Sequence, residues 1–175
     1  MWEEEKYVQN GYHGCGFKIL YDATTNEFDK SGIKEIYLIA CNPNASNSSK
    51  RLYYLLTNVE FMDLRLFWDE KKEDLICDED VAIQEFNIRY RWFDLNDNVG
   101  MSGLSIECTN GSKKIHNFRA DWDTWNYGKW MPESRRWSGS EYFVCGAKVK
   151  YAPPGFGNQH DQSRVALLDL AICTW

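Results

Sequence analysis

The sequence predicts an all-β fold, in which three small antiparallel sheets pack as a β-prism around a pseudo-threefold axis. Two observations lead to this prediction. The chain contains three divergent copies of one unit of about 55 to 65 residues, and an internal repeat decides the architecture before any local pattern does. Almost no stretch has the period of an amphipathic helix, and the one candidate, residues 51–67, reads equally well as two β-rich strands, 52–56 and 59–67.

Each copy closes with a mostly apolar strand that runs into a cysteine. These strands end at Cys41, Cys108 and Cys173, and each stretch opens with Asp or Asn. Upstream of each strand lies a piece in which apolar and polar residues alternate, which predicts a second strand with one buried face. The alternating pieces are residues 16–22, 85–91 and 146–152. Polar stretches with Gly, Pro, Asn and Thr join the pieces, and they predict hairpin loops.

A second cysteine precedes each alternating strand, so the cysteines predict one disulfide within each unit. Six cysteines allow many connectivities, and repeat symmetry is the only basis for choosing among them. The pairs that it favours are Cys15 with Cys41, Cys77 with Cys108, and Cys145 with Cys173. No Cys-x-x-Cys pair occurs, which makes disulfides a better interpretation than zinc binding or thioredoxin-type redox chemistry.

Tryptophan-bearing segments precede the alternating strand in the second and third units, at residues 64–69 and 121–137. The first unit begins late and has only Trp2 and Tyr7 in that place. This truncation predicts that the last strand, near Trp175, completes the first sheet. The whole chain, 1–175, is expected to form one domain. Its units are about residues 1–50, 51–112 and 113–175.

The cysteines and three N-x-S sequons predict a secreted, extracellular glycoprotein. The sequons begin at Asn44, Asn47 and Asn110. The N-terminus, Met1 to Glu5, has no apolar signal core, so we expect an exported mature form with an added Met1. No run of about 18 apolar residues occurs, so no membrane span is expected. The net charge of −6 argues against a nucleic-acid partner, because such partners need clustered Lys and Arg.

No nucleotide-binding motif and no common hydrolase motif occurs, so enzymatic function lacks a motif to support it, and neither a cofactor nor a metal is expected. Glycosidic chemistry needs two carboxyls that face each other across a cleft. Three aspartates are of interest because repeat symmetry brings them toward one end of the prism. They are Asp29, Asp97 and Asp161, which we keep as candidate ligand-binding residues. We interpret them first as turn caps, because Asn96 stands in the aligned place of Asp29 and Asp161.

Aromatic residues make up 15% of the chain, and aromatic faces are suited to stacking on the C–H face of a sugar ring. The densest group lies at residues 122–137. Within it, Trp130 and Trp137 stand among charged residues and proline, so we expect partial exposure and assign both as candidate ligand-binding residues. The alternative is that they pack in the core. Three tryptophans at repeat-related places, Trp2, Trp68 and Trp125, are expected to fill the prism axis.

At the residues named below, the sequence resembles the vitelline membrane outer layer protein I family. The third unit carries the best match: Trp122 and Trp125, Val144 to Gly146, Pro153 to Gly155, and Asp161 to Cys173. The second unit follows the same pattern at Asp97, Asn98, Met101, Gly103, Leu104 and Cys108. The sequence departs from the family at the second acidic residue of an Asp-Asp pair, which is Lys30 in the first unit and Gln162 in the third.

The resemblance implies a β-prism of three Greek-key sheets, secretion, and residence in an extracellular coat or fluid. It also implies an association with lysozyme-like binding or transfer of N-acetylglucosamine oligosaccharides. The leading hypothesis is an extracellular glycan-binding or structural coat protein, whose partners are glycans or other coat proteins. The alternatives are a weak glycosyl transferase or hydrolase acting on such oligosaccharides, and a secreted toxin or effector that uses the prism as a recognition module.

Overall fold

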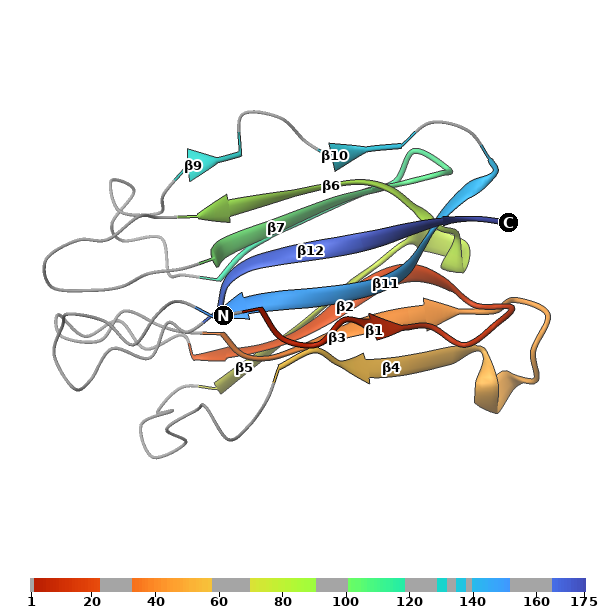
Figure 1. Cartoon of the computed structure of the whole chain (residues 1–175), viewed down its shortest axis with the longest axis horizontal. Coiled ribbons are helices and arrows are strands. Elements are labelled where there is room, and N and C mark those ends of the chain that lie inside the picture. The colour runs from red at the N-terminus through yellow and green to blue at the C-terminus, as the bar shows by residue number, and fades with distance from the viewer. Residues whose placement is uncertain are drawn as a thin grey trace, which may run out of the picture.

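In the computed structural model of the chain, three antiparallel sheets account for nearly all of the regular structure (Figure 1). The structure describes residues 2–22, 33–57, 70–90, 101–118, 129–131, 135–137, 140–151 and 165–175. Within these ranges the only helical elements are two short 3-10 turns, η1 (Asn47–Ser49) and η4 (Asp78–Asp80). The all-β class and the three antiparallel sheets are therefore confirmed. None of the described residues lies in a helix long and apolar enough to cross a membrane.

Each sheet is built on one long hairpin. The first sheet has the order β4-β3-β2-β5, with β2 (His13–Asp22), β3 (Ile33–Cys41), β4 (Arg51–Leu55) and β5 (Glu70–Ile76). The second has the order β10-β6-β7-β8, with β6 (Ile83–Tyr90), β7 (Met101–Cys108), β8 (Lys113–Asn117) and β10 (Arg135–Arg136), while β9 (Lys129–Trp130) also pairs with β6. The third has the order β1-β11-β12, with β1 (Lys6–Tyr7), β11 (Tyr142–Tyr151) and β12 (Val165–Thr174).

The three hairpins share two irregularities of register. One extra residue enters the first strand of each hairpin near its start, and one enters the second strand opposite a tyrosine. The first set of extra residues is Cys15, Gln84 and Cys145, and the tyrosines are Tyr21, Tyr90 and Tyr151. A β-bulge increases the local right-handed twist of a strand. The hairpins therefore bend at matching places.

The inward faces of the three sheets form one hydrophobic core. The alternating strands predicted from the sequence supply it, since every second side chain points inward. Fully buried members come from every sheet: Phe17, Ile19, Ile36, Leu38, Ile83, Leu104, Ile106, Val144, Val149 and Val165. Burying one such side chain contributes about 1.5–3 kcal/mol. This shared core holds the sheets together.

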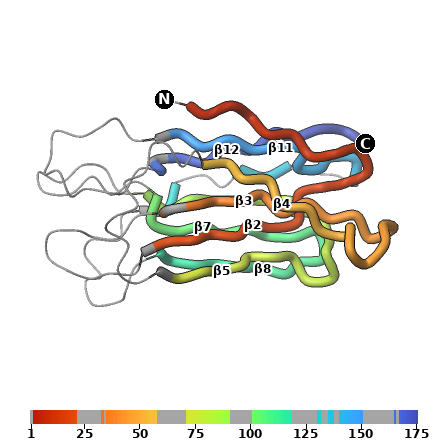
Figure 2. Tube along the Cα trace, turned by 90° about the horizontal axis from the view of Figure 1, so that it is seen from below, coloured from red at the N-terminus to blue at the C-terminus, as the bar shows by residue number. Residues whose placement is uncertain are grey.

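Each hairpin takes a further strand from another part of the chain. β5 pairs with β2, β9 and β10 pair with β6, and the N-terminal β1 pairs with β11. The prediction that the last strand completes the first sheet is therefore wrong, because β12 pairs with β11, and the first strand completes the third sheet instead. Figure 2 shows the red N-terminal segment beside the blue hairpin β11–β12. Pairing with the free edge of β11 satisfies backbone groups that would otherwise face water.

All six cysteines are in disulfides, in the pairs that repeat symmetry favours. Cys15–Cys41 and Cys145–Cys173 each join the two strands of one hairpin. Cys77–Cys108 is different, because it joins the residue after β5, in the first sheet, to the end of β7, in the second sheet. The middle disulfide is thus a covalent link between two sheets.

A histidine also lies at the contact between the first and second sheets. His116 of β8 places its Nε2 atom 3.0 Å from the hydroxyl of Tyr21 in β2, and its Nδ1 atom lies 3.7 Å from a carboxylate oxygen of Glu73 in β5. Burial lowers the pKa of His116, and the charge of Glu73 opposes that effect in part. The neutral ring is therefore the form that the folded protein favours.

Acidification is expected to destabilise the protein through His116. A histidine whose pKa is lowered by folding binds more protons in the unfolded chain, so the free energy of unfolding falls as the pH drops below about 6.5. Urea unfolding at about pH 7.5 and about pH 5 measures this loss. In His116→Gln the difference between the two pH values should shrink. An equal difference in both proteins would exclude His116 as its source.

Candidate ligand-binding pocket

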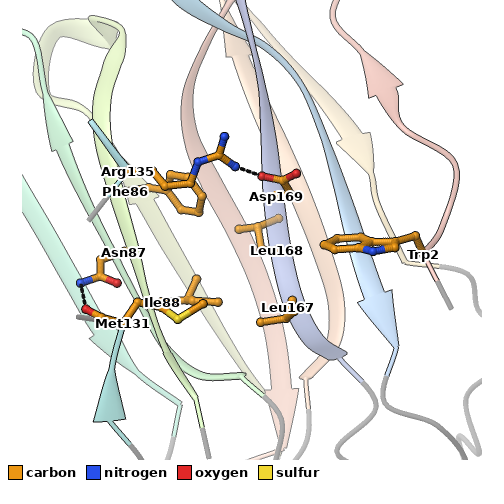
Figure 3. Close-up of a pocket in the computed structure, with 9 residues that line it drawn as sticks. All are labelled: Trp2, Phe86, Asn87, Ile88, Met131, Arg135, Leu167, Leu168 and Asp169. Carbon is orange, nitrogen blue, oxygen red and sulfur yellow. Dashed lines mark hydrogen bonds and ion pairs between the residues drawn. The ribbon is translucent and has the colours of Figure 1, made fainter. Parts of the chain in front are cut away.

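A pocket of about 380 Å³ opens between the second and third sheets. Small-molecule sites in proteins typically have volumes of about 300–1,000 Å³. Four separate segments line it, namely the N-terminus, β6, the stretch around β9 and β10, and β12 (Figure 3). The lining residues are Trp2, Phe86, Asn87, Ile88, Met131, Arg135, Leu167, Leu168 and Asp169. Most of the wall is apolar, and a few polar groups face it.

One wall of the pocket is an edge of β12 on which no described strand pairs. Among the described strands β12 pairs only with β11, and the N–H of Leu170 turns away from β11 to donate to Oδ1 of Asp169 at 3.0 Å. Backbone directions alternate along a strand, so the N–H and C=O of Leu168 face the same way. Val149 of β11, which stands opposite Leu168, agrees with this direction. Its carbonyl points away from β12 and accepts a hydrogen bond from the N–H of Glu3 at 2.9 Å, so this pair of residues does not bond across the hairpin. Leu168 therefore presents a backbone donor and acceptor to the pocket.

Asn87 supplies a second hydrogen-bonding group. Its Nδ2 atom donates to the carbonyl of Met131 at 3.2 Å, which fixes the amide (Figure 3). Its Oδ1 atom is buried and has no hydrogen-bond partner in the described part of the chain. A buried acceptor without a partner costs about 1–3 kcal/mol. Because this atom is covered, an O–H or N–H group of a ligand would reach it only after the amide turns toward the pocket.

Charged and aromatic groups border the same pocket. The guanidinium of Arg135 in β10 forms an ion pair with Asp169 in β12, which links the two sheets across the pocket, and it lies 5.9 Å from the ring centroid of Phe86 (Figure 3). Trp2 lies beyond β12, where it forms an isolated bridge with Lys150 of β11. The indole is 41% exposed, so one aromatic surface is open to a ligand.

The exposure of Trp2 contradicts its predicted place in the core. The N-terminal segment lies along the edge of β11, outside the shared core, so its side chain reaches the surface. Trp68 and Trp125, expected in the same role, lie outside the described residues. In register, the counterpart of Trp2 is Trp130, which stands opposite Arg89 on β6 as Trp2 stands opposite Lys150 on β11.

Neither candidate tryptophan lines this pocket, although both are near its lining residues. Trp130 is half-buried and directly precedes Met131. Trp137 is half-buried, packs against the core and donates from Nε1 to the carbonyl of Ile83 at 3.1 Å. Its ring centroid is 6.5 Å from that of Phe86, which does line the pocket. These contacts agree with the packing alternative for Trp137.

The three candidate aspartates, Asp29, Asp97 and Asp161, lie outside the described residues. The sequon residues Asn44, Asn47 and Asn110 are all exposed. Within the described ranges, no group of three or more His, Cys, Asp or Glu side chains is placed to hold a metal ion. What the pocket offers is therefore an aromatic surface, fixed hydrogen-bonding groups and an ion pair, which suit noncovalent recognition of a ligand with both apolar and hydroxyl surfaces.

Comparison with known proteins gives a family and a fold. A family model described as "Vitelline membrane outer layer protein I (VOMI)" matches residues 1–175. The structure resembles that of a prostate-specific WGA16 glycoprotein lectin, with a TM-score of 0.50 and 12% identity over 99% of this chain and 90% of that chain. It also resembles PirB, with a TM-score of 0.51 and 9% identity over 97% of this chain but 32% of that chain. No curated protein sequence matches the chain.

Proposed function

The chain belongs to the vitelline membrane outer layer protein I family, and from this premise we propose that it is a secreted protein that binds carbohydrate or has a structural role in an extracellular coat. The pairing of all six cysteines supports secretion, because disulfides persist in oxidising compartments. The exposure of Asn44, Asn47 and Asn110 leaves each sequon open to glycosylation. The lectin among the similar structures has the same fold at 12% identity.

We further propose that the fold is a β-prism of three Greek-key sheets made by three divergent repeats. Two features support this architecture. The three hairpins carry bulges at matching places, and each receives a strand from another part of the chain at its corresponding edge. Under this proposal the exchanged strands tie each repeat to its neighbour in a closed ring.

Carbohydrate binding is proposed at the pocket between the second and third sheets. The observation that carries it is a combination of three features of the described residues: Oδ1 of Asn87, which has no partner among them, the edge of β12 at Leu168, on which none of their strands pairs, and the exposed Trp2. Sugars pair apolar C–H faces with hydroxyls that both donate and accept hydrogen bonds, so they match an aromatic surface next to fixed acceptors and donors. Trp130, Trp137, Asp29, Asp97 and Asp161 remain proposed ligand-binding residues in addition.

Replacing Trp2 is expected to weaken sugar binding. On a glycan array and in solution titrations with the glycans retained there, Trp2→Ala should lose about 1–3 kcal/mol of binding free energy, the scale of an aromatic anchor. Its melting temperature should change little, because Trp2 is 41% exposed and lies outside the shared core.

Trp175→Ala is the matched control. Trp175 is another exposed tryptophan, 64% exposed, and it stacks on Phe143 at the far end of the third sheet (Figure 1). Equal losses of binding in both variants would rule out the pocket as the site. Failure of the wild-type protein to retain any glycan would rule out carbohydrate binding.

A further inference from the structure

We propose that the sugar bound at this pocket is acidic, and that Lys148 and Lys150 bind its carboxylate or sulfate group beside Trp2. This inference rests on the proposed carbohydrate binding and specifies the chemical class of the ligand. It concerns the outward face of β11, next to the pocket.

Lys148 and Lys150 are placed together by the strand itself. Residues two apart on a strand share a face, so both side chains extend from the outward face of β11. Their Nζ atoms lie 5.2 Å and 5.8 Å from the ring centroid of Trp2. Two ammonium groups therefore border the one exposed indole that lines the pocket.

Two of the neighbouring carboxylates, those of Asp169 and Glu4, are engaged by other groups. Asp169 stands opposite Lys148 in the sheet, but it pairs with Arg135 and accepts the N–H of Leu170. Leu167, opposite Lys150, is apolar. On the neighbouring N-terminal segment, Glu4 pairs with Lys6 at 3.6 Å.

Lys148 and Lys150 are therefore two adjacent cationic groups on an acidic protein. Within the described ranges neither Lys148 nor Lys150 forms an ion pair, although the chain has a net charge of −6. Two ammonium groups beside one ring repel each other, and an anion that contacts both relieves that repulsion. Each ammonium offers three donors, and hydrogen bonds from a charged donor to an anionic oxygen are short and strong.

The position of the lysines restricts the ligand further. An anion bound there lies beside the indole, while the rest of the ligand must extend toward Leu168 and Asn87. A free inorganic anion would use only the lysines. A sugar that carries an acidic group uses the lysines, the aromatic surface and the pocket together, and this is the ligand that the geometry favours.

The test compares sugars that share one neutral core. Lactose, 3′-sialyllactose and 3′-sulfolactose are immobilised within the same glycan array and then titrated in solution. One acidic form, or both, should bind about ten-fold more tightly than lactose, the factor that one added charge-assisted hydrogen bond supplies. The comparison of the two acidic forms separates carboxylate from sulfate. Raising the salt concentration from about 0.05 to 0.5 M should weaken the acidic sugars selectively.

The variant Lys148→Gln/Lys150→Gln keeps most of the side-chain length and removes both charges, so the ratio of acidic to neutral affinity should fall to about one. Lys18→Gln is the matched control, because Lys18 lies 5.6 Å from the ring of Tyr53 in the first sheet, away from the pocket. The preference should survive in that variant. Melting temperatures confirm that each variant is folded.

Three results would overturn the inference. If acidic sugars bind no better than lactose, this inference fails and the proposed carbohydrate binding still stands. A preference that persists in the double lysine variant would place the acidic group elsewhere. If the array retains neither these sugars nor any other glycan, the proposed carbohydrate binding fails together with this inference.

Discussion

Replacing both Cys77 and Cys108 by serine is expected to lower the free energy of unfolding by about 3–4 kcal/mol, because a disulfide that closes a loop of this length restricts the unfolded chain by about that amount. The two residues are 31 apart in sequence. The bridge also joins the first sheet to the second, so its loss frees two layers of the core to separate. Chemical denaturation of the double variant measures the change.

The double variant Cys145→Ser/Cys173→Ser separates these two effects. Its bridge has a similar sequence separation, 28, but joins strands of a single hairpin. If only chain entropy matters, the two double variants should lose nearly equal amounts of unfolding free energy. A larger loss for the pair at Cys77 and Cys108 is the expected result, and an equal or smaller one would mean that linking the sheets adds nothing.

Gly16→Ala is expected to lower the free energy of unfolding by about 3 kcal/mol, at the upper end of the range for overpacking. Gly16 lies in β2 directly opposite Ile76 of β5, and an added Cβ atom would sit 2.8 Å from Cα of Ile76 and closer still to the carbonyl oxygen of Leu75. Both neighbours are backbone atoms in a paired strand, so neither can move without breaking the β2–β5 ladder.

Gly146→Ala provides the comparison, because Gly146 holds the corresponding place in β11. Its Cβ would meet the carbonyl oxygen of Lys6 at 2.8 Å, in a strand of two residues at the edge of its sheet. That strand can shift outward, so the loss should be smaller. Urea denaturation of both variants tests this order. A Gly16→Ala protein as stable as the wild type would show that β5 also yields.

The hairpins were predictable because their signal is local. Alternation in residues 16–22, 85–91 and 146–152 specifies which side chains are buried, and the described residues of these segments belong to β2, β6 and β11. The family was predictable for a related reason, since part of its motif, at residues 144–146 and around Cys108 and Cys173, lies in these hairpins. The first of the two strands expected within residues 51–67 is β4, and the second, 59–67, lies outside the described residues.

The exchange of strands between sheets was not predictable from local pattern. The residues of β1 and β12 do not indicate which strand each will pair with, because that depends on which edges are free once the core has formed. Trp2 illustrates the consequence. Its sequence context suggested a core tryptophan, but pairing of the N-terminus with β11 places it on the surface.

The pocket was unpredictable for a further reason, because four segments distant in sequence contribute to it. Asn87 sits at an outward position of an alternating strand, where a polar residue normally faces water. Nothing near it in sequence indicates that Met131 covers its amide and leaves Oδ1 buried. Leu168 belongs to an apolar run, and the free edge of its strand follows only from the sheet order.

The pairing of β1 with β11 also sets an order of events during biosynthesis. The ribosome makes β1 first among these strands, yet the partner of β1 emerges only after nearly every other strand has been made. Contacts between residues so far apart in sequence form slowly and late. Until then the N-terminal segment with Trp2 and Tyr7 has no strand to pair with. The edge of β11, once made, can still pair with a strand of another chain. Closure by the N-terminal strand thus removes one of the open edges through which a nascent molecule could pair with another chain.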